Sequence, residues 1–328
     1  MLAYTIRRVL ISIPVLIGST ILVFIMVKIS GDPLQNLKLR NPPPPAQSIK
    51  LEEHRLGLDQ SWPLQYWNWL KGLVLHGDFG QSVQAGNNIG SEIGSHLLVT
   101  VRLVFFSVLI ALILAIITGV LSAVKQYSVL DYSTTFFGFL FLSMPVFWFA
   151  VLLKSLGIWY NQNVSAGTFY TIGDKSVVLT NDTTWGHITD VAGHMVLPTI
   201  VLGLAGYAGW TRFTRASMLE VLNSDHVRLA RAKGLRSRKV LIRHALRNAL
   251  IPLTTVTALD IASLLGGAIL TEQVFQWNGM GTLFVQSLVN RDGHLMMGWL
   301  LVAASLVILF NLIADLLYGI LDPRIRHA

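Results

Sequence analysis

Polar and small side chains recur at helical spacing within two otherwise apolar segments of this sequence. In the first segment they fall at positions 257, 260, 263, 267 and 271, which share one face of a helix. A carboxylate inside a membrane is costly, so Asp260 marks a candidate proton site or the wall of a water-filled path. The alternative is helix packing, in which small residues allow close approach and polar groups bond across the interface. The candidate path residues of both segments are Thr257, Asp260, Ser263, Gly267, Asn311 and Asp315.

Positive charge gathers between residues 212 and 249, where ten of the 25 Lys and Arg occur beside two acidic residues. The run Asn223-Ser224-Asp225 predicts the end of one helix and the start of another. A short helix over 226–233 should end at Gly234, a residue suited to the left-handed position after a helix. A further helix is expected from Ser237 to Pro252, with basic residues four apart at 239, 243 and 247. Charge alone could set topology or contact anionic lipid, but a structured helix–glycine–helix element predicts a docking surface for a partner protein.

The sequence contains little that could perform catalysis. It has no G-x-S-x-G, no H-E-x-x-H and no phosphate-binding P-loop motif. It also has no cysteine, which excludes disulfides and thiol chemistry, and its nine histidines are scattered along the chain. We therefore predict no catalytic residue and no metal site on this chain.

Composition places these candidate residues in a polytopic membrane protein. Hydrophobic residues make up 53% of the chain and charged residues 13%, against about a quarter charged in soluble domains. A membrane-spanning helix needs about 20 mostly apolar residues. The sequence therefore predicts an all-α fold with about six transmembrane helices. The six segments are 9–29, 97–124, 133–159, 194–211, 250–273 and 297–320.

The distribution of basic residues predicts the orientation. Arg7 and Arg8, the stretch 212–249 and the C-terminal tail carry most of the positive charge, which favours the cytoplasmic side. Both termini are then cytoplasmic, and 30–96 and 160–193 lie outside. The first apolar segment has no small-residue cleavage site after it, so we interpret it as a retained span. The net charge of +8 is explained by topology and membrane lipid, and we expect no nucleic-acid partner.

The basic stretch resembles a known motif. Residues 225–234, D-H-V-R-L-A-R-A-K-G, and residues 243–252, R-H-A-L-R-N-A-L-I-P, are similar to the "EAA" coupling motif of type I ABC importer permeases. Ala230, Gly234 and Pro252 match its spacing, whereas Arg228-Leu229 replaces the opening Glu-Ala. This variant is typical of the dipeptide/oligopeptide/nickel branch. Further matches follow in the same order along the chain: Gly31-Asp32-Pro33, Gly77-Asp78-Phe79-Gly80, Ser143-Met144-Pro145, Asn278-Gly279-Met280-Gly281 and Leu321-Asp322-Pro323-Arg324.

The resemblance implies a channel-forming permease subunit of a peptide importer in the plasma membrane of a prokaryote. It implies a first transmembrane helix with an extracytoplasmic segment over 1–95, a type I permease core over 96–320 with its coupling loop at 216–249, and a tail over 321–328. Its partners would be a second related permease, two P-loop ATPase subunits that bind ATP and magnesium, and an extracytoplasmic substrate-binding protein. No cofactor is expected on this chain. The residues implied to couple with the ATPases are Asp225, Arg228, Ala230, Arg231, Lys233, Gly234 and Arg236.

Other functions remain open at this point. An importer of nickel or another small solute belongs to the same branch, although nickel favours His or carboxylate ligands that the spans hardly offer. A proton-coupled secondary transporter would use Asp260 or Asp315 and would need no partner subunits. An intramembrane protease would need a nucleophile and base at membrane depth, and the sequence offers no such pair. Neither of the last two functions explains the structured basic element.

Overall fold

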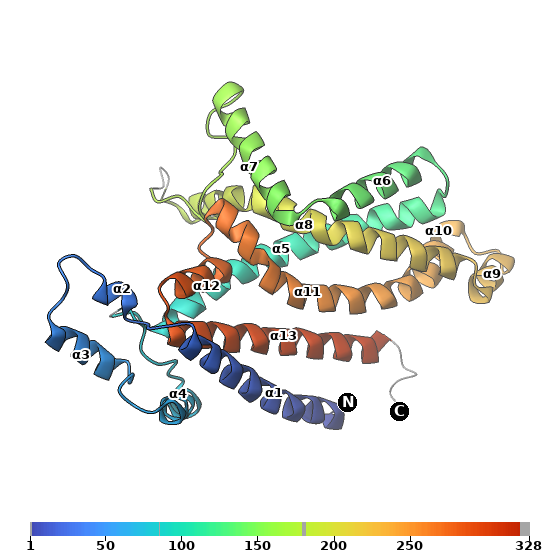
Figure 1. Ribbon diagram of the computed structural model, residues 1–328. Coiled ribbons are helices and arrows are strands. Elements are labelled where there is room, and N and C mark those ends of the chain that lie inside the picture. Colours follow the sequence, from blue (N-terminus) through green and yellow to red (C-terminus); the bar gives the residue numbers. More distant parts are fainter. Residues whose placement is uncertain (1, 85, 179–181, 322–328) are drawn as a thin grey trace. The chain divides into compact units, whose positions relative to one another are not determined.

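The computed structural model describes residues 2–84, 86–178 and 182–321, with side chains except at 2–5, 262–263, 265–267 and 314–321 (Figure 1). The described residues form helices and one isolated β-bridge, between Gln81 and Asn88. The predicted all-α class is confirmed. The chain divides into two compact units, one of residues 101–277 and 309–321, the other of residues 2–100 and 278–308. Helices α5 and α13 each pass from one unit to the other.

The unit that contains the N-terminal helix is built from a long helix, a group of short helices and parts of two further long helices. The short helix α3 ends shortly before Gly57, which has a φ of +67°. The helices of this unit are α1 (Leu2–Ile29), α2 (Gln35–Lys38), α3 (Ala46–Arg55), α4 (Trp62–His76), the start of α5 (Ile89–Val124), α12 (Met280–Val289) and the start of α13 (Gly293–Leu321).

A buried carboxylate ties the loop after α4 to the start of α13. Asp292 is 1% exposed and accepts hydrogen bonds from the Ser82 hydroxyl (2.6 Å) and the Val83 amide (2.9 Å). Its other carboxylate oxygen accepts from the Leu295 amide in the first turn of α13 (3.1 Å). Gly80 has a φ of +92°, and a Cβ there would lie 3.1 Å from the His294 ring. The glycine-rich run at 77–80 therefore lets the loop approach α13 closely.

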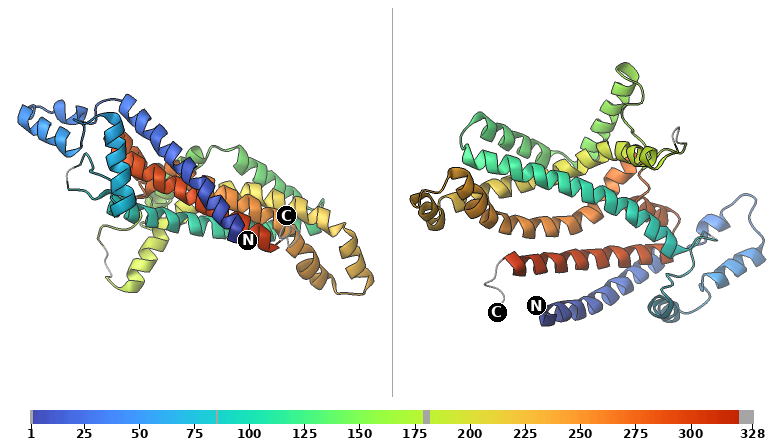
Figure 2. Two further views of the ribbon diagram at one scale, coloured as in Figure 1. Left: turned by 90° about the horizontal axis from the view of Figure 1, so that it is seen from below. Right: turned by 180° about the vertical axis from the view of Figure 1, so that it is seen from behind.

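The second unit is a bundle centred on α8, which packs against α6, α7 and α11 (Figures 1 and 2). Trp210 of α8 is 1% exposed and packs with Ala111 and Ala115 of α5 and with Leu253 of α11. The remaining helices of this unit are α6 (Val129–Ser143), α7 (Val146–Asn163), α8 (Thr184–Leu222), α9 (Asp225–Ala232), α10 (Ser237–Lys239), the π-helix η1 (Val240–Leu246) and α11 (Arg247–Phe275).

Within the described residues, four helices are long and apolar enough to cross a membrane, and the bent pair α6–α7 makes a fifth span if it is counted as one. The four helices are Ile6–Ile29 of α1, α5, α8 and Gly293–Ile313 of α13. The segment 133–159, predicted as one span, is divided between α6 and α7, which pass the test for a span only together and meet at an angle of 104°. Pro145 explains the break, because its ring forces Met144 into an extended conformation (φ −81°, ψ 127°). The predicted segment 250–273 lies within α11, part of whose side chains falls outside the described residues.

Candidate functional site

The basic element predicted at 225–237 is present as a short helix followed by a left-handed turn. α8 ends at Leu222, Ser224 is extended, and α9 runs from Asp225 to Ala232. Gly234 has a φ of +74°. Its amide donates to the Arg231 carbonyl (2.9 Å), and the Leu235 amide donates to the Ala230 carbonyl (3.4 Å). These two bonds make a Schellman turn, which satisfies the last carbonyls of α9 and redirects the chain.

Helix α9 has a buried face and an exposed face. Val227 (0% exposed) and Ala230 (5%) pack into an apolar cluster with Met218 of α8, Val240 of η1 and Ala123 of α5. The buried pair fixes α9 to the ends of three neighbouring helices. The other predicted coupling residues are exposed: Asp225, Arg228, Arg231, Lys233, Gly234 and Arg236. The structure thus presents a charged surface on an anchored helix and gives Ala230 an anchoring position.

The chain after α9 differs from the expected helix. The helix that begins at Ser237 does not end at Pro252 but continues through η1 into α11, which reaches Phe275. Proline has no amide hydrogen, so the carbonyl of Asn248 loses its partner without the helix ending. The side chains at 239, 243 and 247 are exposed as predicted for a basic surface. The wider turns of the π-helix change the register of this row from that of a regular α-helix.

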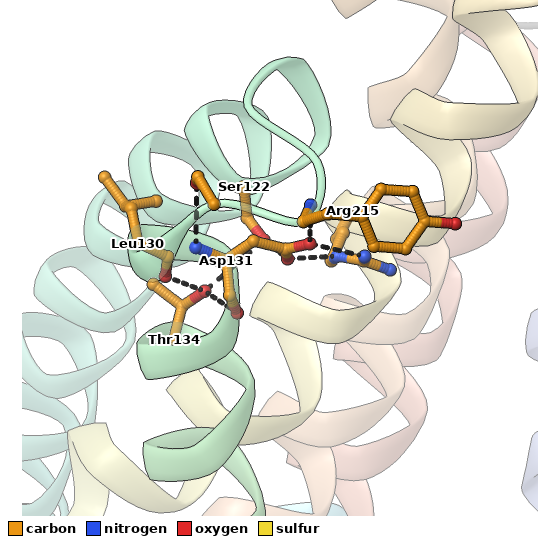
Figure 3. A network of polar contacts seen from close by, with 7 residues as sticks. Ser122, Leu130, Asp131, Thr134 and Arg215 are labelled. Carbon is orange, nitrogen blue, oxygen red and sulfur yellow. Dashed lines mark hydrogen bonds and ion pairs between the residues drawn. The ribbon is translucent and has the colours of Figure 1, made fainter.

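An ion pair links the helices next to this element, and it was not predicted from the sequence (Figure 3). Asp131 in the first turn of α6 is 3% exposed and forms a bidentate pair with Arg215 of α8 (2.7 and 2.8 Å). The same carboxylate accepts hydrogen bonds from the Ser122 hydroxyl of α5 and the Tyr127 amide. It therefore joins α5, the turn after it, α6 and α8. The local sequence signal for this site was an acidic residue, Asp131, three positions after the capping Ser128. The arginine that pairs with Asp131 lies 84 residues away along the chain.

The helices α5 and α8 cross closely at Gly119. A Cβ at this position would lie 2.7 Å from the Thr214 Cβ and 2.9 Å from the Thr211 carbonyl oxygen. Since no real Cβ contact is that short and one neighbour is backbone, only glycine fits. The close crossing brings α5 against the segment of α8 that carries Arg215.

Replacing Gly119 by alanine is expected to push α5 and α8 apart. Overpacking of a tight contact costs about 1–3 kcal/mol of stability, so we expect a lower melting temperature in detergent. Gly209 on α8 is a matched control, because a Cβ there meets no atom within 4 Å. Gly209→Ala should melt near the wild-type temperature, and equal destabilisation by both substitutions would contradict this account.

The candidate path residues lie on α11 and α13. Asp260 is half-buried, and its carboxylate accepts a hydrogen bond from the indole of Trp210 on α8 (2.7 Å). Thr257 is 6% exposed, and its hydroxyl has no hydrogen-bond partner within the described part of the chain. Asn311 on α13 is half-buried. The side chains of Ser263, Gly267 and Asp315 lie outside the described residues. The structure thus connects Asp260 to a helix interface, and the lining of a path stays a prediction.

The Trp210–Asp260 hydrogen bond is expected to contribute to the packing of α8 on α11. Trp210→Phe removes the indole donor and leaves a half-buried carboxylate unsatisfied, which costs about 1–3 kcal/mol. The companion variant Asp260→Leu removes the carboxylate as well, so Trp210→Phe/Asp260→Leu should be more stable than Trp210→Phe alone. Thermal unfolding of the purified variants measures the difference. Equal stability of the single and double variants would show that the hydrogen bond contributes little.

Potential metal ligands do not gather in the described residues. No group of three or more His, Asp or Glu side chains lies close enough to hold a metal ion there.

Comparison with protein families gives two matches that together cover most of the chain. Residues 111–327 match the family described as "Binding-protein-dependent transport system inner membrane component". Residues 1–91 match the corresponding N-terminal family of membrane components. The first match includes α9 and the buried residues that anchor it.

Curated relatives match over their whole lengths. The chain is 42% identical to the oligopeptide transport system permease protein AppB of Bacillus subtilis (strain 168), covering 100% of both chains. It is 39% identical to the dipeptide transport system permease protein DppB of Escherichia coli (strain K12), covering 100% of this chain and 99% of that protein. It is 34% identical to the oligopeptide transport system permease protein OppB of Mycobacterium tuberculosis (strain ATCC 25618 / H37Rv), covering 99% of each.

A solved structure shares the fold. A chain from the inward-facing MetNI methionine ABC transporter superposes with a TM-score of 0.53 at 16% identity. The superposition covers 71% of this chain and 98% of the other. The likeness shows a type I importer permease fold.

Proposed function

The chain belongs to the family of inner membrane components of binding-protein-dependent transport systems, and we propose that it is the channel-forming permease subunit of an ATP-driven peptide importer. The observation that carries the proposal is identity of 34–42% with three peptide-transport permeases along nearly the whole chain. The substrates in their names are dipeptides and oligopeptides, which favours peptides over nickel or another small solute as the cargo of this chain.

The exposed face of α9 is the proposed docking surface for an ATPase subunit. Val227 and Ala230 hold α9 against three neighbouring helices, so a push on its exposed face moves those helices with it. The charged side chains around that face, among them Arg228 and Arg231, would meet an acidic surface on the partner. Complementary charge there favours the association rate and the correct pairing more than affinity.

The remaining parts of the transporter lie on other subunits. Two P-loop ATPases would bind and hydrolyse ATP with magnesium, so no catalysis is assigned to this chain. A second related permease would complete the pathway, and an extracytoplasmic binding protein would deliver the peptide. The basic residues orient the chain with both termini in the cytoplasm of a prokaryote and residues 30–96 and 160–193 outside its plasma membrane.

The proposed path runs along the polar face of α11 and includes positions 311 and 315 of α13. Thr257 supports this role, because its buried hydroxyl lacks a hydrogen-bond partner within the described residues. Such a group would find one in a path that contains water or in the second permease. The residues assigned to the path are Thr257, Asp260, Ser263, Gly267, Asn311 and Asp315.

Affinity purification of the tagged chain from its own host tests the assembly. In mild detergent we expect a second permease and P-loop ATPases to copurify, identified by mass spectrometry. The untagged strain is the control for non-specific binding. A stable chain that repeatedly purifies alone would contradict an importer subunit.

Uptake by the reconstituted transporter separates peptide import from its alternatives. Uptake of a labelled oligopeptide should require ATP, should be blocked by vanadate and should persist when a protonophore collapses the proton gradient. A proton-coupled transporter would give the opposite pattern. Excess unlabelled peptide should compete with the labelled peptide and nickel should not, whereas ATP-dependent uptake of nickel alone would replace the peptide assignment.

A further inference from the structure

Helix α4 exposes an apolar face on the side opposite its packing surface. Its inner face packs Tyr66 and Trp69 against Phe24 of α1 and Met297 of α13. Positions 64, 67, 71, 74 and 75 follow the spacing of one outer helix face. Four of these side chains are apolar and largely exposed, and Lys71 lies among them: Leu64 (46% exposed), Trp67 (61%), Val74 (72%) and Leu75 (62%).

The contacts of α4 with α1 place it at the depth of the membrane. The Tyr66 hydroxyl is hydrogen-bonded to the Thr20 hydroxyl (2.9 Å), and Gln65 accepts a hydrogen bond from Lys28. Thr20 lies nine residues before Ile29, where the apolar span of α1 ends. At a rise of about 1.5 Å per residue, this corresponds to about 13 Å along the helix. Half of the hydrocarbon core of a bilayer is about 15 Å, so α4 lies beside the part of α1 that spans one leaflet.

We propose that the outer face of α4 is inserted into the phospholipid of that leaflet, on the side from which residues 30–96 emerge. Apolar side chains at this depth, Trp67 among them, meet acyl chains. The Lys71 side chain can extend its ammonium group to the lipid phosphates. α1 itself exposes Leu22 (56%) and Met26 (61%) over the same length, as expected for a helix with lipid beside it.

The insertion gives α4 a defined role in this unit. Because the same helix packs on α1 and α13 through Tyr66, Trp69 and Leu73, lipid on its outer face holds α4 between the bilayer and these two spans. The Trp69 indole donates to the Phe79 carbonyl (3.0 Å), and Phe79 lies in the loop that is tied to Asp292. The lipid contact therefore fixes the short helices of residues 30–96 at the membrane surface.

Fluorescence quenching in a bilayer tests the inference. The chain has no cysteine, so Trp67→Cys and Val74→Cys can each carry a single bimane label. The labelled chain is studied in its purified transporter complex in nanodiscs, with phospholipids brominated on their acyl chains or with iodide in the buffer. We expect the brominated lipid to remove most of the fluorescence at both positions and iodide to remove little.

Two further positions calibrate the experiment. Leu10 on α1 is 59% exposed within the apolar span, so the fluorescence of a label on Leu10→Cys should be quenched by brominated lipid. Leu51 on α3 is 65% exposed, so the fluorescence of a label on Leu51→Cys should be quenched by iodide. Quenching of positions 67 and 74 by iodide, as at 51, would place the face in water. Protection from both quenchers would mean that another protein surface covers it, and either result overturns the proposal. Size-exclusion chromatography verifies that the complex is intact.

Discussion

Gly234→Pro is expected to abolish peptide uptake while the chain remains in the membrane. Gly234 has a φ of +74° and donates its amide to Arg231. Proline fixes φ near −65° and has no amide hydrogen, so it can neither adopt the turn nor make the bond. The helix–turn that presents α9 to the proposed ATPase would be lost. Uptake of labelled peptide and ATP hydrolysis by the reconstituted transporter are the measurements, and hydrolysis should no longer respond to substrate.

The surroundings of Gly234 make this test specific to backbone conformation. A Cβ at this position meets no atom within 4 Å, so the strain of a substitution arises from the backbone and not from contact of the Cβ with a neighbour. Asn tolerates the left-handed region better than other non-glycine residues, and Gly234→Asn should retain most uptake. Gly234→Ala should fall between the two. Unchanged uptake by a Gly234→Pro variant that is present in the membrane would argue against a coupling role for the turn. An equal loss of uptake in the asparagine and proline variants would argue against it as well.

Arg215→Met is expected to lower the stability of the chain by about 3 kcal/mol, because removing one partner leaves a buried charge uncompensated. The charge concerned is the Asp131 carboxylate, which is 3% exposed and holds α5, α6 and α8 together. Thermal unfolding in detergent should show a clear decrease in melting temperature. If the Asp131–Arg215 pair also transmits movement from α9, peptide uptake should fall in variants that still fold.

Two variants control for the loss of an arginine. Arg212 on the same helix is exposed and lies 4.4 Å from the Phe139 ring centroid, a contact worth about 0.5–1 kcal/mol at an exposed site. Arg212→Met should therefore cost much less than Arg215→Met. The double variant Asp131→Asn/Arg215→Met removes both charges and should recover part of the stability. Equal melting temperatures for Arg212→Met and Arg215→Met would contradict a structural role for the ion pair.

Much of the proposed docking surface, which consists of α9 and the turn at Gly234, could be predicted from the sequence. The start of α9 near Asp225, the left-handed Gly234 and the exposure of the basic side chains agree with expectation. These features depend on a few neighbouring residues, because caps and helix-ending turns are determined by local hydrogen bonds and allowed dihedral angles. The continuation of the following helix past Pro252 was not predicted. Proline weakens a helix locally, but packing of α11 on α8 can outweigh that cost.

The sequence by itself determined the membrane class, most of the apolar segments and the position of the helix–glycine–helix element. It could do so because transfer of an apolar segment into lipid depends on the composition of about 20 consecutive residues. Only the tertiary structure decided that Asp131 pairs with Arg215, that Trp210 bonds to Asp260 and that α6 and α7 meet at 104°. Each partner is one of several polar residues that a linear pattern offers, and packing of distant helices selects it. Composition and local dihedral preferences depend on consecutive residues, whereas the choice of partner across a helix bundle depends on the folded chain.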